Sequence, residues 1–127
     1  MVVTEEATVR VMIADDDFDM RLLVRATLGG DDRLDVVAEA EDGTGALEQF
    51  RASNPDVCIL DYRMPGLSGL EAATQILAEA PDTKILLFSA YLTPEVTNAA
   101  ARLGVGCLRK DLFMDLPDTV VELARAS

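Results

Sequence analysis

The residues Val57-Cys58-Ile59-Leu60 (VCIL) form an uninterrupted apolar run that ends at a single carboxylate, Asp61. A second run of the same kind, ILLF, covers residues 85–88 and ends at a serine. A strand with one solvated face alternates apolar and polar residues, whereas a parallel strand covered on both faces reads as a continuous apolar run. These two stretches therefore predict central strands of a buried parallel sheet.

Helix-like segments alternate with strand-like segments on both sides of these runs. The sequence predicts strands over residues 9–14, 34–40, 56–60, 84–88 and 106–109, and helices over residues 18–28, 43–52 and 115–126. Two further helices are predicted from apolar side chains at helical spacing, namely Leu67, Leu70, Ala73 and Leu77 in one, and Val96, Ala99, Ala100 and Leu103, after an N-cap at Thr93, in the other. This alternation predicts an α/β fold with a parallel sheet, helices on both faces and right-handed crossovers.

Length and composition limit the domain count and the class of partner. The 127 residues suffice for one domain, so we expect a single domain over residues 1–127 with a flexible N-terminal tail at 1–7. A net charge of −12 argues against nucleic-acid binding by this domain, and the lack of histidine excludes imidazole catalysis and His-ligated zinc. No run is long enough for a membrane span and no secretion signal is visible. Cys58 and Cys107 lie in apolar runs, which predicts reduced thiols in the core and a cytoplasmic location.

Polar side chains follow four of the five predicted strands, at the point where each strand ends. They are Asp15, Asp16 and Asp17 after the first strand, Asp61 after the third, Ser89 after the fourth and Lys110 after the fifth. The ligand crevice of an open parallel sheet lies outside the carboxyl ends of its strands. We therefore expect these side chains to share one site.

Adjacent carboxylates need water or a cation to disperse their charge. Two of them about 4 Å apart repel by about 4 kcal/mol at an effective dielectric of about 20. Oxygen ligands from two strands, completed by water, suit Mg²⁺, so we interpret Asp15 and Asp16 as part of a magnesium site. Asp17 and Asp19 are expected instead to be solvated residues at the start of a helix, where the helix dipole favours negative charge.

The other strand-end residues suit phosphoryl chemistry. A carboxylate can attack phosphorus to give an aspartyl phosphate, and Asp61, alone at the end of a central strand, is the preferred nucleophile. Lys110 and Ser89 would supply a cation and a neutral donor to the charge that develops on the phosphoryl group.

Four motifs carry a resemblance to a known family. They are ADDD (14–17), LDYRMPG (60–66), FSAY (88–91) and CLRKD (107–111). Each motif is weak alone, but the four in this order at strand ends are highly specific. The chain resembles the receiver domains of two-component response regulators, the CheY-like superfamily, from about Val9 to Ala126. The resemblance implies a flavodoxin-like three-layer sandwich with a five-stranded parallel sheet of order 2-1-3-4-5.

The resemblance also implies a role for each residue of the site. Asp61 matches the phosphoacceptor, Asp16 a direct ligand of Mg²⁺ and Asp15 a neighbour that acts through water. The backbone carbonyl of Arg63 matches a further metal ligand, and its side chain is expected to point to solvent.

Three more positions match residues that respond to phosphorylation. Ser89 matches the hydroxyl that reports it, Ala90 the small residue that leaves room for the phosphoryl group, and Lys110 the family's invariant lysine. The family often has an aromatic residue where this chain has Cys107, so Tyr91, two residues after the serine, is expected to carry more of the response.

The resulting hypothesis is a phosphoryl-accepting signalling switch that is not an enzyme on a separate substrate. The implied partners are a sensor histidine kinase or a phosphotransfer protein as donor, and a downstream output domain or target protein, with a phosphorylation-linked homodimer as one form. Two alternatives remain open. One is a degenerate receiver that acts only as a protein-binding module. The other is a haloacid-dehalogenase-type phosphohydrolase, which would need an aspartate where this chain has Arg63.

Overall fold

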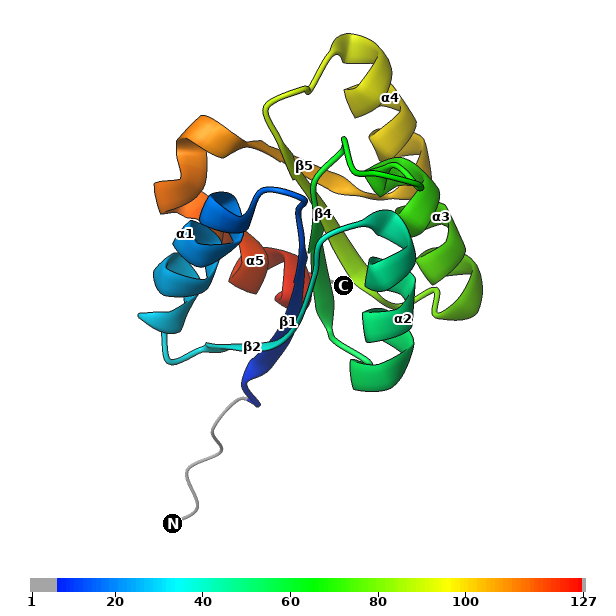
Figure 1. Ribbon diagram of the computed structural model, residues 1–127. Coiled ribbons are helices and arrows are strands. Elements are labelled where there is room, and N and C mark those ends of the chain that lie inside the picture. The colour runs from blue at the N-terminus through cyan, green and yellow to red at the C-terminus, as the bar shows by residue number, and fades with distance from the viewer. Residues whose placement is uncertain (1–6, 127) are drawn as a thin grey trace.

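The computed structural model describes residues 7–126, and its centre is a parallel sheet of five strands (Figure 1). The strands are β1 (Val9–Ala14), β2 (Leu34–Ala40), β3 (Val57–Leu60), β4 (Lys84–Ser89) and β5 (Gly106–Arg109). Their order is β2-β1-β3-β4-β5, so the expected fold class and strand order are confirmed. Of the expected flexible tail, residues 1–6 lie outside the described residues.

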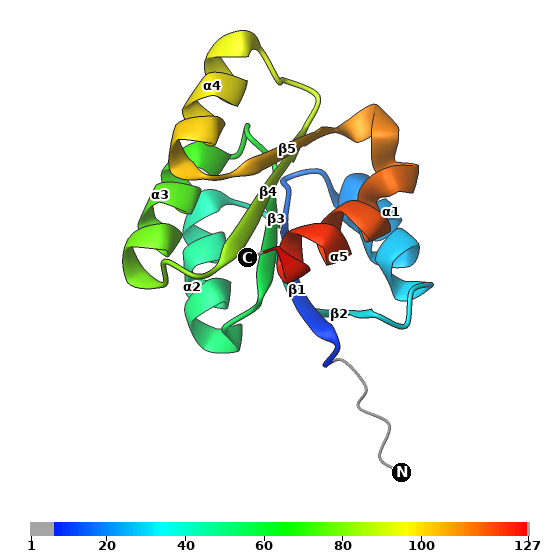
Figure 2. The ribbon, with the colours of Figure 1, turned by 180° about the vertical axis from the view of Figure 1, so that it is seen from behind.

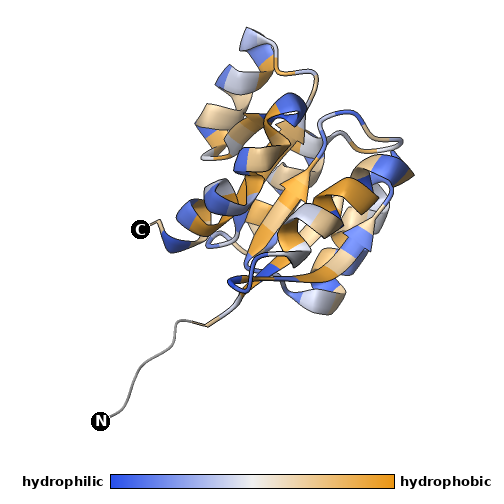
Figure 3. Cartoon of the chain, turned by 90° about the vertical axis from the view of Figure 1, so that its left-hand side faces the viewer, coloured by the Kyte–Doolittle hydropathy of each residue, from blue (hydrophilic) through white to orange (hydrophobic). Residues whose placement is uncertain are grey.

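Helices cover both faces of the sheet, as Figures 1 and 2 show from opposite sides. They are α1 (Phe18–Gly29), α2 (Gly43–Ser53), α3 (Gly69–Glu79), α4 (Pro94–Leu103) and α5 (Leu116–Arg125), with a 3₁₀ helix, η1 (Lys110–Asp115), before α5. One apolar cluster joins the sheet to α2, α3 and α4, and the other joins it to α1 and α5. The VCIL and ILLF runs are buried between these layers, and the strands in Figure 3 are correspondingly hydrophobic.

Two predicted helix starts have different outcomes. Thr93 caps α4 as expected, because its hydroxyl accepts the Val96 N–H at 3.3 Å. The prediction that Leu67 lies in a helix is wrong, since α3 begins at Gly69. Ser68 and Glu71 form a reciprocal capping box there, and this fixes the first turn two residues later than the apolar spacing suggests.

Other differences concern the edge strand β5 and the helices α4 and η1. Cys58, on central β3, is fully buried as predicted, but Cys107 is half-buried because β5 is an edge strand that is incompletely covered. Leu103, expected on the apolar face of α4, is 36% exposed at the last turn. Both cysteines are free thiols. The helix η1, which has no buried residue, had no counterpart among the predicted elements.

Candidate functional site at the carboxyl edge of the sheet

The register of the strands brings the predicted site residues to one edge. Ala14 of β1 pairs with Leu60 of β3, so Asp15 and Asp61 are the next residues on neighbouring strands. The N–H of Asp61 donates to the carbonyl of Ala14 at 2.9 Å, which continues the ladder to the point where the carboxylates begin. Ser89 of β4 pairs with the last residue of β5, so Lys110 follows at the same edge.

Three carboxylates from two strand ends form an acidic cluster. One oxygen from each of Asp15, Asp16 and Asp61 lies within 4.8 Å of the others. Asp15 and Asp61 are buried, whereas Asp16 is exposed to solvent. This arrangement of oxygen donors, part buried and part open to water, fits a divalent cation of the Mg²⁺ type.

Lys110 supplies positive charge to the same cluster. Its Nζ lies 2.7 Å from Asp15 Oδ2 and 3.0 Å from Asp61 Oδ2, and its side chain is 16% exposed. Burial alone would lower the pKa of Lys110, but its hydrogen bonds with both carboxylates raise it above the usual value. Lys110 is therefore charged and acts as the internal counterion of the cluster.

The charges of the cluster remain out of balance. Burial raises the pKa of Asp15, although hydrogen bonds from Lys110 and from the backbone N–H of Asp17 oppose the effect. Three carboxylates face one ammonium group, so the cluster carries excess negative charge when all three are ionised. A divalent cation would offset that charge.

One oxygen of Asp61 has no partner. Its Oδ2 accepts a hydrogen bond from Lys110 Nζ, while Oδ1 is buried and accepts no hydrogen bond from residues 7–126. A buried carboxylate oxygen without a partner is costly, and such groups are rare in folded proteins. This atom is therefore available to a cation or to an incoming electrophile, and it supports the fit of a metal ion to these residues.

Close packing fixes the backbone that carries Asp61. The N–H of Gly69 donates to the carbonyl of Tyr62 at 2.8 Å. A Cβ at Gly69 would lie 2.2 Å from the carbonyl oxygen of Asp61, so no larger residue fits between α3 and the end of β3. The first turn of α3 thus lies directly against the candidate acceptor.

The other aspartates of the first motif have the structural role that the sequence predicts. The carboxylate of Asp17 caps α1 by accepting the N–H groups of Asp19 and Met20 at 2.9 and 3.3 Å. Asp19 lies exposed in the first turn. Both therefore serve the start of the helix, which leaves Asp15 and Asp16 for the cluster.

Ser89 is fully buried at the same edge, and its hydroxyl oxygen accepts the N–H of Tyr91 at 3.2 Å. Ala90 between them is exposed. The structure thus places Ser89 and Ala90 on the expected edge, while the direct contacts of the cluster are those of the carboxylates with Lys110.

The Arg63 side chain makes a contact that the sequence did not predict. It is exposed, as expected, but its guanidinium carbon lies 3.8 Å from the centre of the Tyr91 ring. The contact joins the loop after β3 to the loop after β4. The sequence gives one indication of this contact: Arg63 lies two residues after Asp61, and Tyr91 lies two residues after Ser89, so both occupy the same position relative to a strand end. Arg63 also lines a shallow pocket of about 340 Å³ that reaches Asp16.

Comparison with protein families gives one match that covers most of the chain. The model described as the response regulator receiver domain matches residues 11–117. Among residues 7–126, no helix combines the length and the apolar character needed to cross a bilayer.

Curated relatives include regulators of transcription. The chain is 40% identical over 104 residues to the probable transcriptional regulatory protein NarL of Mycobacterium tuberculosis, which covers 81% of this chain and 48% of NarL. It is 34% identical over 120 residues to the uncharacterized transcriptional regulatory protein YxjL of Bacillus subtilis, covering 94% and 54%. The chain therefore spans about half the length of these relatives.

Solved structures match over almost the whole chain. The signal receiver domain of the putative response regulator NarL from Mycobacterium tuberculosis has a TM-score of 0.90 at 35% identity, covering 96% of this chain and 100% of that one. The isolated REC domain of RcsB from Salmonella enterica serovar Typhimurium, in the presence of the phosphomimetic BeF₃⁻, has a TM-score of 0.87 at 26% identity, covering 94% and 91%.

Proposed function

We propose that this chain, which belongs to the family of response regulator receiver domains, is a switch that accepts a phosphoryl group on Asp61. The observation that supports this acceptor is the state of its two carboxylate oxygens. Oδ2 accepts a hydrogen bond from Lys110, whereas Oδ1 is buried and has no hydrogen-bond partner in the described part of the chain. An oxygen in that state is desolvated and oriented, which favours its attack on phosphorus.

Asp15, Asp16 and Asp61 would hold Mg²⁺, and the backbone carbonyl of Arg63 would be a further ligand. The bound ion would neutralise negative charge on the cluster and on the phosphoryl oxygens. Lys110 would offset part of the same charge, since it already lies within hydrogen-bond distance of two carboxylates.

The protein would report phosphorylation through Ser89. Its hydroxyl accepts one hydrogen bond from the backbone of Tyr91 and retains its own proton to donate to a phosphoryl oxygen. Ala90, which is small and exposed, would leave room for that group. A shift of the Ser89 loop would then change the surface near Tyr91 and its contact with Arg63, which is the kind of local event that biases a two-state equilibrium.

The phosphodonor would be a phosphohistidine on a sensor kinase or a phosphotransfer protein. The relatives are named as transcriptional regulators about twice as long as this chain, so the target would be an output domain or a separate protein. We place the domain in the cytoplasm, with a homodimer as one phosphorylated form. The domain would catalyse its own phosphorylation and dephosphorylation and no reaction of a separate substrate.

Intact mass spectrometry after incubation with acetyl phosphate and Mg²⁺ tests this proposal. The wild type should gain the mass of one phosphoryl group, and Asp61→Asn should not. Asp17→Asn is the matched control: it removes a neighbouring carboxylate, but asparagine also caps helices well, so uptake should persist.

Each outcome separates the candidate functions. Uptake that persists in Asp61→Asn would refute the acceptor. No uptake by the folded wild type, from acetyl phosphate or from a phosphorylated kinase, would favour a degenerate receiver that only binds proteins. Repeated turnover of a phosphate ester would favour a phosphohydrolase.

A further inference from the structure

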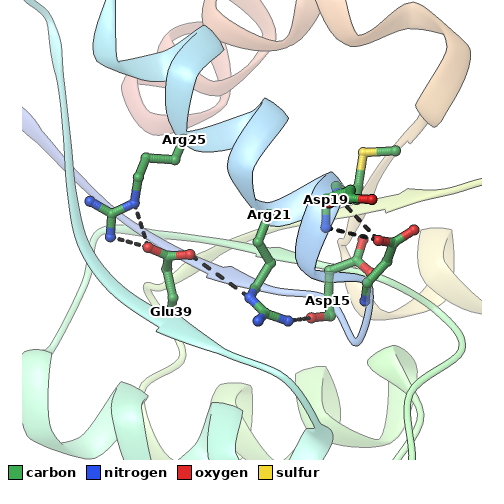
Figure 4. A network of polar contacts seen from close by, with 7 residues as sticks. Asp15, Asp19, Arg21, Arg25 and Glu39 are labelled. Atoms are coloured by element: carbon green, nitrogen blue, oxygen red, sulfur yellow. Dashed lines mark hydrogen bonds and ion pairs between the residues drawn. The ribbon is translucent and has the colours of Figure 1, made fainter.

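The acidic loop between β1 and α1 is held at its first residue by a guanidinium from α1 (Figure 4). Nη1 of Arg21 donates a hydrogen bond of 2.6 Å to the backbone carbonyl oxygen of Asp15. The Arg21 side chain is 14% exposed, so the bond is largely shielded from water. A hydrogen bond from a charged donor is stronger than one between neutral groups. The carbonyl of Asp15 is therefore fixed by a strong contact.

Two further contacts hold the Arg21 side chain in position. The carboxylate of Glu39 on β2 lies 3.9 Å from Arg21 Nε, and the same carboxylate accepts hydrogen bonds from Arg25. The Phe18 ring lies 5.5 Å from the guanidinium carbon of Arg21. Arg21 is thus oriented by β2 and by its own helix, as Figure 4 shows for the polar contacts.

The direction of the Asp16 carboxylate, by contrast, is set by the backbone. Among residues 7–126, no side-chain hydrogen bond or ion pair holds this carboxylate. On either side, Asp15 Oδ1 accepts the N–H of Asp17 at 2.9 Å, and Asp17 caps α1. The direction of the Asp16 carboxylate therefore follows from how the backbone of residues 15–17 is fixed. Arg21 supplies the contact to the carbonyl at the first of these residues.

We propose that Arg21 is a positioning residue for the metal site, which holds the Asp15 carbonyl and thereby directs the Asp16 carboxylate toward a divalent cation. The inference rests on the proposed function, because it assumes that Asp15 and Asp16 bind Mg²⁺. It adds a residue of α1, outside the cluster, on which the affinity for the ion depends. Glu39 takes part indirectly by orienting Arg21.

The sign of the effect separates positioning from charge. A guanidinium near an acidic cluster repels a divalent cation, so if Arg21 acted through charge alone, its removal would tighten Mg²⁺ binding. If Arg21 positions the loop, its removal weakens binding. Arg25 offers a matched control. It shares the Glu39 carboxylate and carries the same charge, but among residues 7–126 it forms no hydrogen bond or ion pair with Asp15.

Titration of the full chain with Mg²⁺, followed by calorimetry or by amide NMR shifts, tests the proposal. Arg21→Ala should raise the dissociation constant for Mg²⁺ about tenfold, the usual size of the effect when a partner behind a metal ligand is lost. Arg25→Ala should change it by less than about threefold, as expected for loss of an exposed ion pair. Arg21→Lys keeps a charged donor and should recover part of the affinity. Thermal unfolding without Mg²⁺ gives the fold stability of each variant.

A second readout excludes a general loss of structure. At saturating Mg²⁺ the rate of phosphorylation of Arg21→Ala should return close to that of the wild type, because the defect is one of affinity. Unchanged or tighter Mg²⁺ binding by Arg21→Ala would overturn the inference, and so would equal weakening by Arg25→Ala or a rate that stays low at saturation. Failure of the wild type to bind Mg²⁺ would instead overturn the proposed metal site itself.

Discussion

Replacing Lys110 by methionine tests whether this lysine is the internal counterion of the site. The change keeps a long apolar side chain and removes the ammonium group that lies 2.7 Å from Asp15 and 3.0 Å from Asp61. The two carboxylates are 5% and 7% exposed, so water offers them little compensation. Without Mg²⁺, the Lys110→Met variant should therefore be markedly less stable than the wild type.

The size of the loss follows from the burial of the three groups. Removing one partner of a buried ion pair costs about 3–5 kcal/mol. Asp15, whose pKa burial already raises, can take up a proton more readily in the variant, so we expect the lower end, about 3 kcal/mol. A chain of 127 residues has an unfolding entropy of about 0.27 kcal/mol/K, at about 2.1 cal/mol/K per residue. The melting temperature should therefore fall by about 10 °C.

Calorimetric melting with increasing Mg²⁺ completes the test. The variant presents three carboxylates without the lysine and should bind the cation more tightly, so the gap in melting temperature between variant and wild type should narrow as Mg²⁺ is added. Lys84→Met is the control, because Lys84 is the first residue of β4 and lies at the amino end of the strands, opposite the site. A variant that melts with the wild type, or a gap that does not change with Mg²⁺, would refute the counterion role.

Further predictions concern packing and the thiols. Gly69→Ala places a Cβ 2.2 Å from the Asp61 carbonyl oxygen, so it should lower the free energy of unfolding in denaturant by about 3 kcal/mol and slow phosphoryl uptake. Gly29→Ala should be neutral or slightly stabilising, because beyond the helix's own backbone a Cβ there meets no atom of residues 7–126 within 4 Å. In the native protein, iodoacetamide should modify half-buried Cys107 before fully buried Cys58, and mass mapping that shows the reverse order would contradict the burial. Burial raises the pKa of Cys58 from 9.0 to about 12, so above pH 9 the thiol ionises in the unfolded state but not in the folded one. The free energy of unfolding of the wild type should therefore fall relative to that of Cys58→Ala by about 1.4 kcal/mol per pH unit above 9. Parallel stability curves for the two proteins would contradict this.

The sequence predicts the carboxylate cluster well because strand periodicity and strand ends determine it. VCIL and ILLF reveal buried parallel strands, and a parallel register brings the residues that follow them to one edge. Asp61 and Lys110 are 49 residues apart in the chain, yet their contact follows from strand order and register. Because β4 lies between β3 and β5, the contact also depends on the length of the lysine side chain.

Contacts between loops are less accessible from the sequence. The Arg63–Tyr91 contact and the bond from Arg21 to the Asp15 carbonyl depend on side-chain directions that no periodicity encodes. Likewise, the apolar character of Cys107 predicts burial, but the position of β5 at the edge of the sheet leaves it half covered. The sequence therefore predicts the surroundings of residues on central strands more reliably than those of residues on the edge strand β5 and in loops.

The difference between the central strands β1 and β3 and the edge strand β5 also affects how the site can switch. The carboxylates Asp15 and Asp61 follow β1 and β3, whose last four residues are all buried, so the backbone at these positions is held on both faces. Lys110 follows the partly buried β5 and begins η1, which has no buried residue. Segments with few buried contacts are the ones that move at low free-energy cost. When the charge at Asp61 changes, movement of Lys110 therefore costs less free energy than movement of the carboxylates. Because Lys110 begins η1, which leads directly into α5, its movement would also shift the surface formed by η1 and α5.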